Sequence, residues 1–294
     1  MKKIFLSLIL ALIGFTAPCQ LLWQVSGNGL SRPSYVVGTH HFAPASMIDS
    51  IPGLPQAIQD CDMVYGEVEK DSLMSQAVQM RIAQAMMAPA DSTLDQLLSP
   101  EGYKIVEQIF NKYFAGMGVT LDQLKMLKPN GLSTQMQALQ AIQHFPNFDP
   151  NGMIDVAVQS RANALGKPLG GLETVDSQID LLFNTPLSTQ AADLLETCKK
   201  DDMFEEISSM LSEAYMRQDL GALEAIFTDP EIGDDAEALD RLIYNRNRSW
   251  AAKLTHILPE RSVLVCVGAG HLPGDQGLLQ LLRNAGYTVT PVTQ

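Results

Sequence analysis

The sequence of 294 residues contains few cysteines, few aromatic residues and few basic residues. Only four cysteines occur and no Cys-x-x-Cys pair is present, which argues against a structural zinc ribbon and a thioredoxin-type redox site. Lys and Arg number 20 against 33 Asp and Glu, so the formal net charge is −13. Nucleic-acid binding requires clustered positive charge, and we therefore expect no nucleic-acid partner.

Several common catalytic motifs are also missing. The chain has no Gly-x-Ser-x-Gly elbow, no His-Glu-x-x-His pair and no phosphate-binding loop, so serine-hydrolase, zincin and nucleotide chemistry lack support. In contrast, 46% of the residues are hydrophobic and 18% are charged, a composition that allows a sizeable core. The length suits one large domain or two ordinary ones.

The N-terminus has the pattern of a targeting segment. Two lysines precede the hydrophobic stretch 4–15, and small residues follow it, which predicts a secretory signal peptide at 1–19. The stretch is too short for a transmembrane helix, so we expect a chain beginning at Gln20, without a stable membrane span, in the periplasm or outside the cell. Cys19 raises the alternative of a lipoprotein, but the proline before it favours soluble export.

Strand patterns lie near both ends of the chain and a helical pattern lies between them. The predicted strands are 21–25, 35–37, 63–68, 262–267 and 287–292, with a shorter one at 169–172. An Asn-Gly turn predicts that the first two strands are antiparallel. A helix at 49–61 predicts a right-handed crossover that makes the third strand parallel to the second. We predict one α/β domain at 20–294, with a central mixed sheet built from the N- and C-terminal segments and a large helical insert at about 72–255.

Two of the predicted strands end in the same motif. Gly38 is followed three residues later by His41, and Gly268 is followed by His271. Ligands of open α/β sheets collect at the C-terminal ends of the strands. Two imidazoles at that edge indicate a metal site or an acid–base site, although a single histidine after a strand is often only a hydrogen-bonded residue.

Glu67 and Arg246 are the next candidates. Glu67 lies at the end of a predicted apolar strand, where a buried carboxylate is costly unless it is paired or ligates a cation. It could be a metal ligand or a general base toward a bound water. Arg246, in a helix predicted at 236–257, could hold a substrate carboxylate or a developing oxyanion, with a surface salt bridge as the alternative.

Other residues receive a lower rank. Asp155 suits a helix N-terminus as well as a site, and Glu173 is an acid near a segment end. The remaining lower-ranked residues are His40, Glu69, His144 and His256. Besides Cys19, the cysteines are Cys61, Cys198 and Cys266, an odd number that leaves at least one thiol unpaired. The sequence does not decide whether Cys61 and Cys198 form a disulfide.

At these residues the sequence resembles the TraB/GumN family, which includes the Tiki-type metalloproteases. The resemblance covers most of the chain after residue 19, in order, although the helical middle contributes little. The matching segments are 22–23, 35–41, 66–67, 154–155, 166–168, 171–174, Arg246 and Asn247 with Trp250, 267–274 and 286–287.

This resemblance implies an α/β core of the erythromycin-esterase/ChaN-like type with a helical insert. It also implies divalent-metal-dependent hydrolysis with Mn, Co or Zn, metal ligation by His41, His271 and Glu67, and a functional arginine at Arg246. The leading hypothesis is an exported metal-dependent peptidase. Its alternatives are a non-catalytic protein that binds haem, a metal or a small ligand, and a metal-independent esterase-type hydrolase. The substrate and the oligomeric state stay open.

Overall fold

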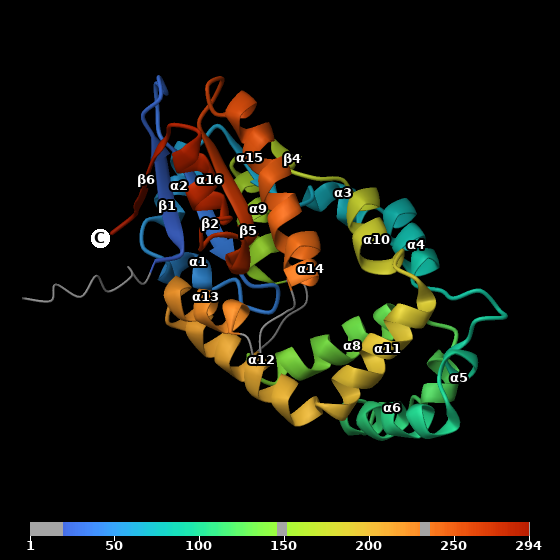
Figure 1. Ribbon diagram of the computed structural model, residues 1–294. Coiled ribbons are helices and arrows are strands. Elements are labelled where there is room, and N and C mark those ends of the chain that lie inside the picture. The colour runs from blue at the N-terminus through green and yellow to red at the C-terminus, as the bar shows by residue number, and fades with distance from the viewer. Residues whose placement is uncertain (1–19, 146–151, 230–235, 294) are drawn as a thin grey trace, which may run out of the picture.

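The structure is a computed structural model that describes residues 20–145, 152–229 and 236–293. The predicted signal peptide lies outside these residues. A six-stranded mixed sheet with the order β4-β3-β5-β2-β1-β6 forms the centre, and helices surround it (Figure 1). The predicted α/β fold with a mixed sheet and a helical insert is therefore confirmed.

The sheet has an antiparallel part and a parallel part. The strands are β1 (Leu22–Ser26), β2 (Ser34–Thr39), β3 (Met63–Gly66), β4 (Leu169–Gly171), β5 (Val263–Gly268) and β6 (Thr288–Pro291). β1 pairs antiparallel with β2, as expected for a strand pair joined by a tight turn, and it also pairs antiparallel with β6. β2, β5, β3 and β4 run parallel, so their C-terminal ends share one edge.

The register of β2 and β5 brings the two repeated motifs together. Gly38 lies opposite Val267, and Thr39 lies opposite Gly268. A Cβ atom on Gly38 would come within 3.0 Å of the backbone and side chain of Ala269. The absence of a side chain at Gly38 therefore allows the loop after β5 to pass close to β2, which places both histidine-bearing loops at the same edge.

The helices before the insert and at the C-terminus differ slightly from the prediction. Two helices, α1 (Met47–Ser50) and α2 (Leu54–Asp60), replace the single predicted one, because Gly53 adopts a left-handed conformation with φ of 76° between them. The last helix, α16 (Leu278–Asn284), begins three residues later than the predicted start at 275.

The remaining helices confirm a mainly helical middle of the chain. They are α3 (Lys70–Met74), α4 (Gln76–Ala85), α5 (Leu94–Leu97), α6 (Pro100–Tyr113), α7 (Leu121–Leu124), α8 (Pro129–Ile142), α9 (Ile154–Ala164), α10 (Val175–Phe183), α11 (Leu187–Lys199), α12 (Asp201–Met216), α13 (Leu220–Thr228), α14 (Ala236–Leu239) and α15 (Asn245–Ile257). A π-helical turn, η1 (Asp240–Tyr244), joins α14 to α15. The helix predicted at 236–257 is therefore continuous but contains this widened turn.

The insert has a hydrophobic core of its own. The main core lies on the sheet and includes the buried side chains of β1, β2 and β5. A second core, centred on Phe110 and Leu132, lies among α5, α6, α8 and α11, which Figure 1 shows as a helical group away from the sheet. α12 runs from this group back to α13, beside the sheet (Figure 1). The insert also supplies the edge strand β4.

The three cysteines in the described part of the chain, Cys61, Cys198 and Cys266, are buried and unpaired. The possible Cys61–Cys198 disulfide is therefore not formed. No helix among the described residues combines the length and the apolar character that crossing a bilayer requires.

Candidate metal and catalytic site

Four adjacent parallel strands each deliver a candidate side chain to one edge of the sheet. His41 follows β2, Glu67 follows β3, Glu173 follows β4, and His271 lies in the 3-10 turn Ala269–His271 after β5. We predicted Glu67 inside a strand reaching residue 68, but β3 ends at Gly66. The backbone oxygen of Glu67 still accepts a hydrogen bond from the amide of Glu173 at 2.9 Å, which ties the two loops together.

Arg246 lies at the centre of a buried ion group. Its Nη2 donates to Oε2 of Glu67 at 2.5 Å and to Oε1 of Glu173 at 2.7 Å, and its Nε donates to Oε2 of Glu173 at 3.2 Å. Its Nη1 donates to the backbone oxygen of Leu242 at 3.0 Å and lies 3.0 Å from Nε2 of His271. All five N–H groups of the guanidinium thus have acceptors. With side chains only 12–16% exposed, this is not the surface salt bridge considered as the alternative.

Hydrogen bonds around Asn247 determine the tautomer of His271. The Asn247 amide nitrogen donates to the backbone oxygens of His271 at 3.1 Å and Gln276 at 2.9 Å, so its side-chain oxygen is an acceptor. Nδ1 of His271 lies 2.7 Å from that oxygen and therefore carries the ring proton. Nε2 then has a free lone pair, which faces Arg246. The Trp250 ring packs beside the imidazole of His271, with the two ring centroids 4.5 Å apart.

The electrostatics of the edge keep His271 neutral and Glu67 ionised. Burial lowers the pKa of His271 to about 4, against the attraction of Glu67. Burial raises the pKa of Glu67. The neighbouring side chains of His271, Arg246 and His41 outweigh burial, so the net pKa of this carboxyl lies below its ordinary value. A neutral imidazole and an ionised carboxylate, with Nε2 and Oε1 3.9 Å apart, are the forms that ligate metals.

His41 belongs to a separate hydrogen-bonded pair. Its Nδ1 lies 3.3 Å from Oδ2 of Asp155, and the hydroxyl of Thr39 donates to the other oxygen of that carboxylate. The charge of Asp155 and this hydrogen bond raise the pKa of His41 to about 9. Burial raises the pKa of Asp155, but His41 and Thr39 together lower it below its ordinary value. Asp155, which lies in the first turn of α9, therefore orients His41 and leaves Nε2 of that ring without this partner.

The donor set at this edge fits a divalent metal ion in its chemistry. His41 and His271 each use Nδ1 to contact a side-chain oxygen and present Nε2, an arrangement typical of metal-ligating histidines. His271 is already neutral, whereas His41, with a pKa of about 9, would release its second ring proton when it binds a metal. Two carboxylates face a single guanidinium, which leaves an excess of negative charge. The donor atoms of His41, His271 and Glu67 do not all lie within 4.8 Å of one another. The His41 side chain is 67% exposed, so it has room to move.

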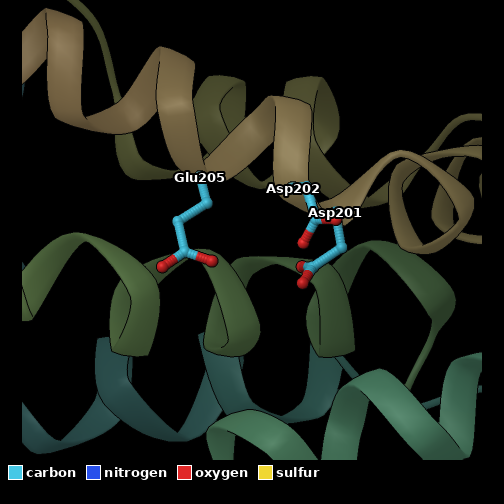
Figure 2. Close-up of side chains that lie close together, drawn as sticks. All are labelled: Asp201, Asp202 and Glu205. Carbon is cyan, nitrogen blue, oxygen red and sulfur yellow. The ribbon is translucent and has the colours of Figure 1, made fainter.

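A carboxylate cluster of the described chain lies elsewhere, on α12. Asp201, Asp202 and Glu205 project from this helix with their oxygens within 4.8 Å of one another (Figure 2). The ammonium group of Lys112 lies 2.7 Å from Asp201 and 2.6 Å from Glu205, and the Tyr113 hydroxyl donates to Asp201 at 2.7 Å. Lys112 therefore already supplies the positive charge, and the cluster joins α12 to α6.

Three residues that contribute to the site, Glu173, Asn247 and Thr39, were not among the site residues predicted from the sequence. Glu173 follows a short predicted strand, so the strand-then-acid pattern that selected Glu67 could have selected it too. Asn247 and Thr39 act through hydrogen bonds that the sequence does not indicate. His40 is closer to the site than expected, because it lines the same cavity as His41. Burial and the repulsion of His41 lower the pKa of His40 to about 4.

Glu69, ranked at the rim, accepts a hydrogen bond from Ser72 at 2.8 Å at the start of α3. It does not line the cavity of about 310 Å³ that opens beside Glu67, Arg246 and His271. This cavity makes the candidate side chains accessible to a ligand.

Comparison with known proteins identifies relatives along nearly the whole chain. The model of the TraB/PrgY/gumN family matches residues 21–291. The chain is 22% identical to "Metalloprotease TIKI2" of Danio rerio over 91% of its length, and 23% identical to "Metalloprotease TIKI1" of Danio rerio over 93%. It spans 60% and 63% of these two relatives, respectively. No solved structure matches the chain.

Proposed function

The chain belongs to the TraB/PrgY/gumN family, and on that premise we propose that it is an exported, divalent-metal-dependent hydrolase that cleaves peptides. The relatives named as metalloproteases support a hydrolase of this type. One observation of the structure carries the proposal: a neutral His271, whose Nε2 lies 3.9 Å from Oε1 of the ionised Glu67, lines the same cavity as that carboxylate.

In this proposal His41, His271 and Glu67 hold the ion. Two imidazole nitrogens and one carboxylate oxygen are ligands that Zn, Co and Mn accept. The bound ion would supply Lewis-acid activation of a carbonyl and a water of lowered pKa. Asn247 and Asp155 position the two rings through their Nδ1 atoms, so they are positioning residues rather than catalytic ones.

Glu67 and Arg246 have the roles of a proton acceptor and an oxyanion-stabilising donor, respectively. If Glu67 does not ligate the ion, its ionised carboxylate can instead act as a general base that accepts a proton from an attacking water, because Oε1 is held by the amide of Gly268 at 2.8 Å and not by Arg246. When Nε2 of His271 serves as a ligand, one N–H of Arg246 loses its acceptor. That N–H can then donate to the developing oxyanion of the substrate.

The test of this proposal is the metal content of the chain from Gln20, purified without chelator and without a metal-affinity step. We expect near-stoichiometric Mn, Co or Zn by plasma mass spectrometry, and cleavage of a mixed peptide pool that a chelator abolishes. His41→Ala and His271→Ala should lose both the metal and the cleavage.

The matched control is His256→Ala, since His256 is exposed on α15 and absent from the cavity lining. This variant should retain metal and activity. Equal metal content in the parent and both site variants, or a parent that cannot be loaded with any of the three ions, would contradict the proposal.

A non-catalytic binding protein is the second candidate. The observation that favours it is the cavity of about 310 Å³, which reaches the size range of small-ligand pockets, roughly 300–1,000 Å³. A small molecule that stays bound through purification, together with no cleavage of any peptide by the metal-loaded chain, would support binding over catalysis. A haem would be detected directly by its absorption spectrum.

The metal-independent esterase alternative is less well supported. It needs a neutral histidine that takes a proton from water or a hydroxyl at neutral pH. With a pKa of about 9, His41 already carries its proton, and Nε2 of His271 faces an Arg246 donor. Hydrolysis of a lactone that persists in excess chelator would restore this alternative.

A further inference from the structure

The cavity beside the candidate site has two chemically different walls. One wall carries the ionisable side chains of His41, Glu67, Arg246 and His271. The other wall is apolar, and its main side chains are Phe42, Leu211, Leu223, Phe227, Leu242 and Ile243. Apart from the site's own groups, no described residue that lines the cavity is charged.

Three elements outside the sheet supply five of the six apolar side chains, and Phe42 comes from the loop after β2. Leu211 comes from α12, Leu223 and Phe227 come from α13, and Leu242 and Ile243 come from η1. Most of these side chains are only partly buried. Partly buried apolar side chains gathered at a cavity are typical of a ligand-binding surface.

The π-helical turn connects this wall directly to the charged centre. η1 places Leu242 and Ile243 at the cavity, and the backbone oxygen of Leu242 accepts the hydrogen bond from Arg246 at 3.0 Å. Single π-turns inside α-helices occur frequently at functional sites, because the extra residue redirects side chains. One turn of helix thus determines both the apolar wall and the position of the arginine.

Gly270 lets the wall approach the loop that carries His271. A Cβ atom on Gly270 would lie 2.9 Å from the ring of Phe227, which is too close. The Phe227 ring therefore lies against the backbone of the His271 loop, and the apolar wall begins next to the candidate ligand.

A second, smaller cavity of about 150 Å³ borders two of the same residues. It shares His41 and Glu67 with the first cavity and has a mixed lining that includes Lys70, Gln159 and Gln178. Since Glu67 borders both cavities, a bond cleaved there would have substrate on both sides. This arrangement suits a peptide better than a small compact molecule.

We propose that the larger cavity is a specificity pocket that binds one large apolar side chain, such as that of Leu, Met or Phe, of a peptide next to its scissile bond. This inference rests on the proposed function and names its substrate class. An apolar side chain gains free energy by leaving water in the pocket, whereas an Asp or Lys side chain would lose its hydration without a partner on the apolar wall.

The experiment measures binding separately from catalysis. Fluorescein-labelled heptapeptides of Gly and Ser that differ only at the central residue (Leu, Phe, Ala, Asp or Lys) are titrated with the chain from Gln20 in excess chelator, and fluorescence anisotropy gives the dissociation constants. We expect the Leu and Phe peptides to bind at least about tenfold more tightly than the Ala, Asp and Lys peptides.

Two variants test whether the apolar wall of the pocket causes the preference for the Leu and Phe peptides. Leu242→Glu places a carboxylate on the wall, so it should remove the preference for Leu and Phe and make the Lys peptide the tightest binder. Phe227→Ala enlarges the pocket, so it should improve binding of a Trp peptide relative to the Leu peptide. The matched control is Leu239→Glu, at the residue immediately before η1 and outside the cavity lining, which should leave the order of affinities unchanged.

The outcomes separate this inference from the proposed function. Equal affinities for all peptides, no binding at millimolar protein, or a Leu and Phe preference that Leu242→Glu leaves intact would overturn the pocket. Cleavage by the metal-loaded chain without an apolar preference would overturn the pocket and leave the peptidase standing. The expected preference in a chain that neither binds metal nor cleaves peptides would leave the pocket standing and overturn the peptidase.

Discussion

The side-chain oxygen of Asn247 lies 2.7 Å from Nδ1 of His271, and this contact determines which ring nitrogen faces the cavity. Asn247 is fully buried, and its amide nitrogen is held by two backbone oxygens, so the amide cannot rotate without losing both hydrogen bonds. The proton of His271 is thereby kept on Nδ1, and Nε2 is kept as a lone-pair donor. A buried residue that does not line the cavity therefore determines which nitrogen of His271 faces it.

The first prediction concerns this contact. Asn247→Ala should weaken metal binding roughly 10- to 100-fold, the usual effect of removing a partner that orients a metal-ligating histidine. Competition with a fluorescent zinc chelator gives the affinity. Asn245→Ala is the control, because Asn245 lies on the same helix but is exposed, and its side chain forms hydrogen bonds with Asp240 and Arg248 rather than with His271. A full-affinity Asn247→Ala variant would show that His271 is not a ligand.

Arg246 and Arg248 provide a second prediction, because they lie two residues apart in different environments. Arg246→Ala leaves the carboxylates of Glu67 and Glu173 buried and unpaired, so it should lower the free energy of unfolding by about 3–5 kcal/mol. Arg248→Ala breaks an exposed ion pair with Asp240 and should cost about 1 kcal/mol or less.

Urea unfolding, monitored by circular dichroism, gives the free energy of unfolding of both arginine variants. The double variant Arg246→Ala with Glu173→Gln should be more stable than Arg246→Ala alone, since one unpaired carboxylate is removed. Equal losses for the two arginine variants would mean that burial does not determine the strength of the Arg246 ion group.

The sequence predicted the edge of the sheet but not the contacts made there. His41 and His271 could be selected because apolar runs that end in Gly-x-x-His predict strand ends, and parallel strands bring their C-terminal ends together. The pairing of Arg246 with Glu173 spans 73 residues, and no local pattern encodes such a contact. The π-turn was missed for a similar reason, since one extra residue in a helix leaves the hydrophobic periodicity almost unchanged.

The third prediction separates the candidate metal site from the carboxylate cluster on α12. Asp201→Asn should leave the metal content unchanged, because Asp201 and Glu205 already pair with Lys112. It should lower the free energy of unfolding by about 1–3 kcal/mol, since the buried Asp201 carboxylate accepts hydrogen bonds from Tyr113 and Lys112. Asp202→Asn, at an exposed position of the same turn, should change neither quantity. Loss of metal in Asp201→Asn but not in His271→Ala would move the metal site to α12.

The last prediction uses the thiol of Cys198, which is 3% exposed. Burial, with a smaller contribution from Asp201, raises the pKa of Cys198 to about 12. Only thiolates react with aromatic disulfide reagents, so the folded chain from Gln20 should react negligibly at pH 8, whereas the same chain unfolded should expose the thiols of Cys61, Cys198 and Cys266. Rapid labelling of the folded chain would contradict the buried positions of these cysteines.

The same raised pKa predicts a loss of stability at alkaline pH. In the unfolded chain this thiol titrates near 8.5, so the stabilising effect of its burial is complete below that pH. Above it the unfolded chain loses a proton that the folded chain keeps, and the free energy of unfolding should fall by up to about 1.4 kcal/mol per pH unit until the folded thiol also ionises. Urea unfolding between pH 8 and 10 measures this slope. Cys198→Ala should have a shallower slope than the parent, because it lacks this titrating thiol. The difference between the two slopes separates the effect of Cys198 from the effects of the tyrosines and lysines that titrate in the same range. Identical slopes would show that Cys198 is not buried as a neutral thiol.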